Sequence, residues 1–356
     1  MKKIVTSLLA AIMALAFVML SGTVVKAEAV EDTGQTWEFI CAFTKNEAAV
    51  SQFTAACERI TERTNGRVSF EYFYSGAQVN AADMPRALEM GTADIGDLVM
   101  ANYPDYFPIS SLIMDLPFLG ITDKSIFAFD QLYQEFPEIE AEYQMGNIHY
   151  LGHALSTAQN LLLVKDVDVH ELKDLNGLKI LTNGNVEAQL LKDGGGAAVQ
   201  ANFPDYYTNL STGLADGLLG HLCAWNSIGA VPLSGRIIFF GDDVSCSFNR
   251  LFCGWYMNLD KWNSLTPEIQ EIFNEEMVQF EQDEYEFRLS DEKKALDQLY
   301  EQNTPFNFLT EEEVATFKDD IQPAITEEIE NLDSLGLPGT AMYERLVEII
   351  EELNNQ

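Results

Sequence analysis

Hydrophobic positions between residues 37 and 154 change repeatedly between a period of two and a period near 3.6. The first period is typical of β-strands with one buried face, and the second is typical of amphipathic helices. The predicted elements are strands at 37–43, 68–74, 95–100 and 148–154 and helices at 48–63 and 82–90. Strands and helices that alternate in this way indicate an α/β lobe.

The same alternation starts again after residue 158 and continues to residue 259. It predicts strands at 159–164, 178–182, 197–200, 236–240 and 252–259 and helices at 169–175, 185–193 and 206–212. Gly194-Gly195-Gly196 ends the second of these helices. We therefore expect a second α/β lobe, and we expect the last two strands to return the chain to the first lobe.

A seven-residue pattern, Leu-x-x-Gly-x-Ala-Asp, occurs in both halves of the chain, at 88–94 and at 210–216. Gly91 and Gly213 are placed to end a helix in the left-handed conformation, and an apolar run follows each aspartate. The repeat predicts two lobes of similar design with a ligand held between them. The alternative is coincidence, because two short helix-to-strand links can share seven residues by chance.

The C-terminal third is predicted to be mainly helical. Thr266-Pro267-Glu268 is a strong helix start, and the pattern continues without Gly or Pro to about Asn303. Such a helix is about 55 Å long at about 1.5 Å per residue. Because this length exceeds one small lobe, we expect the helix to brace both. A short strand at 306–309 and two further helices, starting near 310 and 341, are expected after it.

The N-terminus has the pattern of a secretory signal peptide over residues 1–29. Lys2 and Lys3 precede an apolar stretch at 4–20, and small residues suited to cleavage follow it. An uncleaved membrane anchor is the alternative, but the apolar stretch has only about 17 residues and a cleavage site follows. The mature protein is therefore expected in the periplasm, exported across the inner membrane.

A formal net charge of −35 on 356 residues limits the partners of this protein. Such an acidic surface argues against nucleic acid and against anionic membrane surfaces. Many of the carboxylates fall in the C-terminal helices, where a solvated surface explains them. The length suits two domains with substantial cores.

The five cysteines are an odd number and include no Cys-x-x-Cys pair. They predict neither a metal site nor a disulfide-rich scaffold. In an oxidising compartment Cys246 and Cys253 could pair. Buried free thiols are favoured for most of the five.

Motifs of known enzyme classes are missing from the sequence. It has no Gly-x-Ser-x-Gly, no phosphate-binding Gly-x-x-x-x-Gly-Lys-Ser/Thr and no His-Glu-x-x-His. None of the four histidines, at 149, 153, 170 and 221, has a helical i, i+4 partner, which argues against a catalytic zinc. We expect a binding protein that carries out no catalysis and uses no cofactor and no metal.

Six motifs, spread in order over residues 36–310, carry a resemblance to a known family. They are Tyr-Phe-Tyr-x-Gly at 72–76, Ala-Leu-Glu-Met-Gly-Thr-Ala-Asp-Ile at 87–95, Leu-Pro-Phe-Leu at 116–119, Asp-Leu-Asn-Gly-Leu-Lys-Ile at 174–180, the segment 204–217, and Trp-x-x-Leu-x-Pro-Glu-x-Gln at 262–270. Together they resemble the solute-binding proteins of TRAP (tripartite ATP-independent periplasmic) transporters, of the dicarboxylate-binding, DctP-like family.

The resemblance implies a two-lobed periplasmic binding protein fold (type II-like), α/β in class, with a long helix bracing both lobes. It also implies that a monomer delivers a small-molecule ligand to the permease subunits of a membrane transporter that an ion gradient drives. The expected divisions are a signal peptide at 1–29, lobe I at 34–155 plus 245–285, lobe II at 156–244 plus 286–335, and a C-terminal helix at 336–356.

The chain departs from this family at the expected carboxylate clamp. The arginine that typically follows Gly-Leu-Lys-Ile is Leu181 here, and a second family arginine is missing beside Gly152-His153-Ala154. The lining is instead expected to be aromatic and neutral-polar. The candidate ligand contacts are Phe43, Tyr74, Asn102, Tyr103, His153, Asn183, Phe203, His221, Trp225 and Asn226. For each aromatic residue a place in the core is an equal alternative.

Two ligand classes follow from the missing clamp. The first is a neutral, aromatic or cationic ligand enclosed by rings. The second is an organic acid held by a relocated base: Arg86, Lys165, Arg236, Arg250 or His153. We favour the first, because a buried carboxylate without a cationic partner is costly. Rival functions are a binding protein for an ATP-driven importer or a sensor, a secreted enzyme, and an interaction or scaffold protein.

Overall fold

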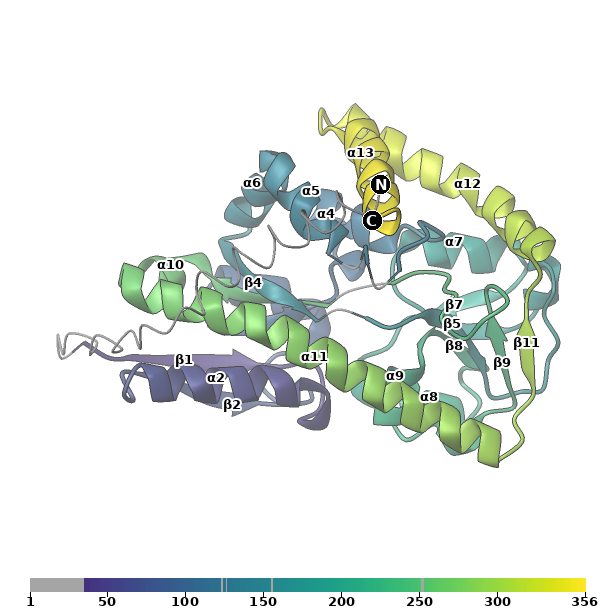
Figure 1. Cartoon of the computed structure of the whole chain (residues 1–356), viewed down its shortest axis with the longest axis horizontal. Helices are drawn as coiled ribbons and strands as arrows, with labels where there is room; N and C mark the ends of the chain where they lie inside the picture. The colour runs from purple at the N-terminus through teal and green to yellow at the C-terminus, as the bar shows by residue number, and fades with distance from the viewer. Residues whose placement is uncertain (1–34, 123, 126, 155, 251–252) are drawn as a thin grey trace, which may run out of the picture. The chain divides into compact units, whose positions relative to one another are not determined.

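Two β-sheets with helices packed against them form the part of the chain that the structure describes (Figure 1). The computed structural model describes residues 35–356 apart from 123, 126, 155, 251 and 252. The predicted signal peptide, residues 1–29, lies outside the described residues. Within the described part, no helix has both the length and the apolar composition of a membrane span.

The first sheet has the strand order β2-β1-β3-β10-β4. Its parallel strands are β1 (Trp37–Ala42), β2 (Val68–Phe73) and β3 (Ile95–Leu98). β10 (Cys253–Asn258) runs antiparallel between β3 and β4 (Ile148–Ala154). The helical segments associated with this sheet are η1 (Ala48–Val50), α2 (Ser51–Arg63), η2 (Ala81–Asp83), α3 (Met84–Glu89), η3 (Met100–Asn102), α4 (Pro108–Asp115), α5 (Ala128–Glu135), α6 (Pro137–Met145) and α10 (Leu259–Asn263).

The second sheet has the strand order β11-β9-β5-β8-β6-β7, with β5 antiparallel to both of its neighbours. Its strands are β5 (Gln159–Leu163), β6 (Lys179–Leu181), β7 (Ala197–Val199), β8 (Gly217–His221), β9 (Arg236–Phe239) and β11 (Phe306–Phe308). The helical segments associated with it are η4 (Leu172–Leu175), α7 (Asn185–Asp193), η5 (Phe203–Asp205), α8 (Tyr206–Ser211), α9 (Leu222–Ser227) and η6 (Val231–Leu233). The predicted α/β fold with two lobes is confirmed, although the residue limits given for each lobe stay a prediction.

Strand β9 does not return to the first sheet, which corrects one expectation. It pairs with β5 and β11 in the second sheet, whereas β10 goes back to the first. Ile237 and Phe239 pack in the core of the second sheet, and Arg236 forms an ion pair with Asp166 at 2.8 Å. Burial of the alternate apolar side chains and this ion pair hold β9 beside β5.

The long helix α11 (Pro267–Glu301) contacts both halves of the fold, as the sequence predicted. Phe273 and Phe280 pack edge-on against aromatic rings of β1 and α2. Further along, Ala295 and Leu299 belong to the core of the second sheet. Figure 1 shows the helix passing from β4 and α10 to α8 and α9. One rigid helix therefore carries side chains to both sheets.

Two more helices complete the chain. α12 (Glu311–Ser334) starts in a capping box, in which Thr310 and Glu313 each bond to the backbone of the other. It packs against α7 and α4, and α13 (Gly339–Asn354) packs against α5 and α12. The last two helices thus return from the second sheet to the helices of the first.

The repeated heptad forms the same turn in both halves. Gly91 and Gly213 have φ angles of +67° and +75°, in the left-handed region that favours glycine. Each glycine follows a short helix, α3 or α8, and each heptad leads into a strand, β3 or β8. The structure therefore confirms that the two copies are equivalent helix-to-strand turns.

All five cysteines are free thiols in the structure, and four of them are buried. Cys246, the exception, is partly exposed and is not paired with Cys253, which lies at the start of β10. The proposed pairing of these two is therefore not present in the structure.

Candidate functional site

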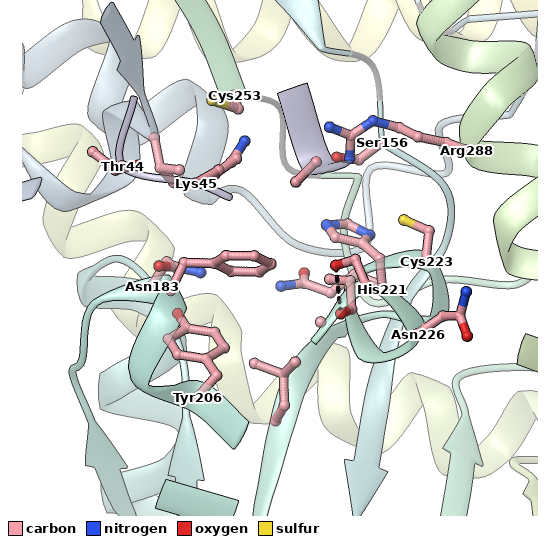
Figure 2. Close-up of a pocket in the computed structure, with 18 of the residues that line it drawn as sticks. Thr44, Lys45, Ser156, Asn183, Tyr206, His221, Cys223, Asn226, Cys253 and Arg288 are labelled. Atoms are coloured by element: carbon pink, nitrogen blue, oxygen red, sulfur yellow. Dashed lines mark hydrogen bonds between the residues drawn. The ribbon is translucent and has the colours of Figure 1, made fainter. Parts of the chain in front are cut away.

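A cavity of about 330 Å³ lies at the carboxyl ends of parallel strands from both sheets. Lys45 follows β1, Asn102 follows β3, and Asn183 follows β6. At this edge of a parallel sheet, loops bring side chains together and ligands commonly bind. Figure 2 shows side chains from both halves of the chain around the same space.

The long helix α11 forms one wall of the cavity. Glu284, Phe287, Arg288 and Asp291 all line it. Their spacing of three or four residues places them on one face of the helix. Because α11 spans both sheets, this face contributes fixed polar and charged groups to a cavity whose other walls are loops and strand ends.

Two cations face the cavity, Lys45 and Arg288. In Figure 2 their side chains extend toward the middle of the cavity from opposite sides. The Arg288 Nε donates to Glu284 Oε1 at 2.7 Å, and both side chains are largely buried. Burial alone would lower the pKa of Arg288, but the Glu284 carboxylate holds that pKa above its usual value. Arg288 is therefore charged at any physiological pH.

His221, the last residue of β8, is a neutral acceptor in the cavity. Burial, together with the charges of Arg288, Arg250 and Lys45, lowers its pKa to about 3. Its Nδ1 lies 2.9 Å from the carbonyl oxygen of Thr157. Because a carbonyl only accepts, Nδ1 carries the proton and Nε2 is left as an acceptor. The neighbouring cations thus favour the neutral form of His221.

Amide side chains supply neutral polar groups around the cavity. Asn102 Nδ2 donates to Asn183 Oδ1 at 3.1 Å, which joins the loop after β3 to the loop after β6. Asn226 Nδ2 donates to Asp291 Oδ1 at 2.8 Å on α11. These bonds orient the amides, and the first of them connects the two halves of the fold directly.

A buried carboxylate supports the floor of the cavity from behind. Gln159 lines the cavity, and its Nε2 donates to Glu187 Oε1 at 2.8 Å. Glu187 also accepts from the backbone N–H of Asn183 at 3.1 Å and from the hydroxyl of Thr182. Burial raises the pKa of Glu187 to about 7. Two cavity residues therefore depend on a carboxylate that does not itself line the cavity.

Aromatic rings cover the apolar part of the wall. The rings of Phe203 and Tyr206 lie 5.4 Å apart, and both residues line the cavity. Tyr103 lines it from the other sheet, and its hydroxyl donates to the carbonyl of Ala81 at 2.7 Å. The cavity therefore offers flat apolar surfaces together with two cations and several amides.

The structure brings six of the ten predicted contact residues to this cavity. They are Asn102, Tyr103, Asn183, Phe203, His221 and Asn226. The match follows from their positions, because most of them lie at or just after the end of a strand. That they contact a ligand stays a prediction.

Four other predicted residues do not line the cavity. Phe43 is fully buried against Phe53 and Trp255, and Tyr74 packs on Phe43 with ring centres 5.8 Å apart. Trp225 is also fully buried, in the core of the second sheet. His153 lies on β4 beside α11, among acidic side chains. For Phe43 and Trp225 the core alternative describes their place in the fold, whereas Tyr74 is only partly buried.

None of the five bases proposed as a relocated clamp lines the cavity. Lys165 and Arg236 form ion pairs with Asp216 and Asp166 on the far side of the second sheet. The remaining three also lie elsewhere: Arg86 on α3, His153 on β4 and Arg250 before β10.

Lys45 and Arg288 were missed by reasoning from the sequence. Lys45 had one available signal, because it follows the carboxyl end of the first strand. Arg288 had only its i, i+4 spacing from Glu284, which is also the spacing of ordinary surface pairs.

The comparisons with known proteins agree on a family of solute-binding proteins. A model of bacterial extracellular solute-binding proteins, family 7, matches residues 43–227 and 252–331. A solute-binding protein from Chromohalobacter salexigens is 22% identical over 216 residues, and the match spans 59% of this chain and 61% of that relative.

Solved structures of TRAP solute-binding proteins share the fold. One from an unidentified marine microbe, in complex with metahydroxyphenylacetate, is 18% identical with a TM-score of 0.77, over 89% of this chain and 99% of that one. One from Desulfovibrio salexigens, with bound orotic acid, is 17% identical with a TM-score of 0.76, over 89% and 100%. One from a Sulfitobacter species, with bound β-D-galacturonate, is 17% identical with a TM-score of 0.73, over 89% and 100%.

Proposed function

This chain belongs to family 7 of the bacterial extracellular solute-binding proteins, and we propose that it captures a small organic anion and delivers it to the permease of a TRAP transporter. The ligand is enclosed between the loops of the two sheets and the wall that α11 provides. No chemistry on the ligand is needed for this role. The differential affinity of the closed form for the ligand is sufficient to shift the open–closed equilibrium.

The observation that carries this proposal is the pair of cations in the cavity. Lys45 and Arg288 approach the cavity from two sides, and both lower the pKa of His221. Of the two acids that also line the cavity, Glu284 is paired with Arg288 and Asp291 with Lys294, so a ligand carboxylate would meet the charged donor of Lys45. Arg288 has a planar donor fork, of which Glu284 engages Nε. The geometry thus supports an organic acid, contrary to the preference for a neutral or cationic ligand that the missing family arginines suggested.

The remaining wall favours an acid with a flat or ring-shaped body. Phe203 and Tyr206 supply apolar faces, and Asn102, Asn183 and Asn226 supply amides suited to hydroxyl or amide groups. Ligands bound by the three structural neighbours are of this kind: metahydroxyphenylacetate, orotic acid and β-D-galacturonate. We propose the same broad class for this chain.

A ligand screen with matched pairs tests the charge of the ligand. Each acid, such as galacturonate or metahydroxyphenylacetate, is compared with its neutral counterpart, galactose or the corresponding amide. We expect stabilisation in thermal-shift assays by acids and not by their neutral partners. Stabilisation by amines, or equally by both members of each pair, would contradict the proposal.

Replacement of Lys45 then tests the site itself. We expect Lys45→Gln to weaken binding of the best acid by about 10- to 100-fold, since a charge-assisted hydrogen bond contributes about 1.5–3 kcal/mol. Lys192→Gln, an exposed lysine on α7, is the matched control and should bind normally. Isothermal titration calorimetry measures both. For Arg288 the double variant Glu284→Gln with Arg288→Gln avoids leaving a buried charge without its partner.

Delivery to a TRAP permease is tested by transport. Membrane vesicles that contain the permease subunits encoded beside this chain should take up the acid when the protein and an ion gradient are both supplied. Uptake that requires ATP instead would favour the alternative, a binding protein of an ATP-driven importer. Conversion of the acid to a product by the purified protein would favour the enzyme alternative.

A further inference from the structure

A second polar cluster lies outside the cavity, where α5, β4 and α11 meet. It consists of Asp130 on α5, His153 on β4 and Glu281 on α11. One nitrogen of the imidazole and one oxygen of each carboxylate all lie within 4.8 Å of one another. None of the three residues lines the ligand cavity. Three elements far apart in the sequence thus bring three metal-binding side chains to one point.

The two carboxylates converge on the same imidazole nitrogen. His153 Nδ1 lies 3.3 Å from Asp130 Oδ1 and 3.9 Å from Glu281 Oε1. The backbone N–H of His153 also donates to Glu281 Oε1 at 2.7 Å, which fixes this carboxylate against β4. His153 itself is buried, so its ring has little freedom to turn away. The donor atoms are therefore held in place by the packing of the fold.

As far as the structure describes them, the ion pairs of the two carboxylates involve only His153. Among the described residues, no lysine or arginine forms an ion pair with Asp130 or Glu281. A cation placed between the two carboxylates would interact favourably with both of them.

We propose that Asp130, His153 and Glu281 bind a divalent first-row transition-metal ion, with Zn²⁺ as the reference ion. One imidazole nitrogen and two carboxylate oxygens are a donor set suited to Zn²⁺ or Mn²⁺. Ca²⁺ is a poorer fit, because it takes about six to eight oxygen ligands. In a site of this kind, bonds from the imidazole nitrogen and the carboxylate oxygens to Zn²⁺ are about 2.0–2.2 Å long.

Tyr150 has to yield its present contact when the ion binds. Its hydroxyl is now hydrogen-bonded to His153 Nδ1, and it donates to Glu281 Oε1 at 3.2 Å. Loss of the first bond frees the nitrogen for the metal, while the second keeps the carboxylate oriented. A partner that orients a metal ligand in this way commonly contributes to metal affinity.

The site would tie together elements that serve both halves of the fold. β4 leads toward Ser156 and Gln159 of the cavity, and Glu281 lies one helical turn before Glu284 on the cavity wall. A bound ion would therefore brace β4 against α11 next to the ligand site. Binding to the folded form would also stabilise that form against unfolding.

The test is metal binding by the purified protein without organic ligand. After treatment with EDTA and its removal, titration with Zn²⁺ should show one bound equivalent by calorimetry and by elemental analysis, with a rise in Tm. His153→Gln should abolish this binding. Asp130→Asn should weaken it by about tenfold or more, since loss of even an orienting partner costs about 10- to 100-fold.

The matched control is His170→Gln. His170 is also flanked by two carboxylates, Asp168 at 3.2 Å and Glu313 at 2.7 Å, but it is exposed on the surface. It should bind Zn²⁺ as the wild type does. The proposal is overturned if the wild type binds no Zn²⁺, or if His170→Gln loses the binding and His153→Gln keeps it. Because Asp130 is partly exposed, Asp130→Asn keeps the test valid even if His153→Gln fails to fold.

Discussion

The two copies of Leu-x-x-Gly-x-Ala-Asp form the same corner in the two halves of the fold. Asp94 and Ile40 exchange two hydrogen bonds: backbone N–H to backbone carbonyl, and backbone N–H to the Asp94 carboxylate, both at 2.8 Å. Asp216 and Lys179 exchange the same two, at 2.6 and 3.0 Å. In both halves the next residue pairs, in parallel register, with the residue after the partner. Each aspartate thus connects a strand to the strand beside it.

Each of these aspartates is also neutralised by a lysine at the surface. Asp94 Oδ1 lies 3.1 Å from Lys261 Nζ, and Asp216 Oδ1 lies 2.6 Å from Lys165 Nζ. The two lysines come from different places in the chain, one after β10 and the other after β5. The two aspartates therefore have equivalent roles, whereas the lysines that pair with them come from positions that are not equivalent.

Beyond the corner, the two halves differ in how they reach the cavity. β3 ends before the cavity, and the loop after it supplies Asn102 and Tyr103. β8 reaches the cavity with its own last residues, including Gly220 and His221. The repeated motif is therefore a scaffold for the strand, and the ligand chemistry is encoded in the residues that follow it.

Replacement of either aspartate is expected to have the largest effect on stability. Asp94→Ala and Asp216→Ala each leave a backbone N–H without its acceptor and remove an ion pair, at a cost of about 3 kcal/mol each. Because the corners lie in separate sheets, the double variant should lose the sum of the two. Urea denaturation measures the free energy of unfolding. A loss for one variant and none for the other would show that the two corners are not equivalent.

Asp216 adds a pH dependence to this comparison. Burial opposes ionisation of Asp216, but its bonds to Lys165 and to the backbone of Lys179 hold its pKa below the usual value. A lowered pKa gives stability that is present at neutral pH and is lost as the pH falls through the pKa in the folded protein. Asp216→Ala should therefore differ from wild type at neutral pH more than below pH about 3.

A second pair of carboxylates, Glu142 and Glu187, tests the difference between the halves. Burial raises the pKa of each to about 7. A raised pKa gives stability that is full below the unfolded-state pKa, about 4.5, and is lost as the pH rises through the folded-state pKa. The unfolding free energy of the wild type should therefore fall between pH 5 and 7. In Glu142→Gln and in Glu187→Gln this fall should be smaller by about 2 kcal/mol, because the titrating group is gone.

Ligand affinity should separate these two variants. Glu142 caps α4 by accepting from the backbone N–H of Ile109 at 2.6 Å, and it does not line the cavity. Glu187 holds Gln159 and Asn183, which line the cavity. Only Glu187→Gln should therefore weaken binding of the best acid from the ligand screen, measured by calorimetry. Equal weakening by both would mean that the effect is a general loss of stability.

Local patterns in the sequence predicted the fold better than they predicted the site. Period-two runs and glycine-ended helices depend on neighbours within a few residues, and these gave both sheets and α11. Asn102 and Asn183 were found because strand ends are also local features. Arg288 and the cluster around His153 depend on which face of α11 meets which sheet. The periodicity of a 35-residue helix does not reveal this, because its apolar positions change sides along its length.

The direction of packing also explains the misplaced candidates. The helix α9 begins directly after the cavity residue His221 and carries Trp225. The Trp225 side chain nevertheless faces the core, and its Nε1 donates to Ser234 Oγ at 2.7 Å. Phe43 directly precedes the cavity residue Thr44 and is fully buried. Neighbouring residues at a strand end point in different directions, so proximity in sequence to a cavity residue does not place a side chain in the cavity.

The smallest expected effect comes from the glycines of the two heptads. Gly91→Ala and Gly213→Ala each place a Cβ on a backbone with a positive φ, which costs about 1 kcal/mol. A Cβ at Gly213 would meet no atom within 4 Å, and one at Gly91 would make only an ordinary contact with Asn258 at 3.7 Å. The loss should therefore be nearly equal in the two variants, because strain in the backbone and not crowding causes it. Asn in place of either glycine should recover part of the loss, since asparagine tolerates this conformation. Urea denaturation of the four variants measures these differences, and a neutral Gly213→Ala would contradict the left-handed turn in the second half.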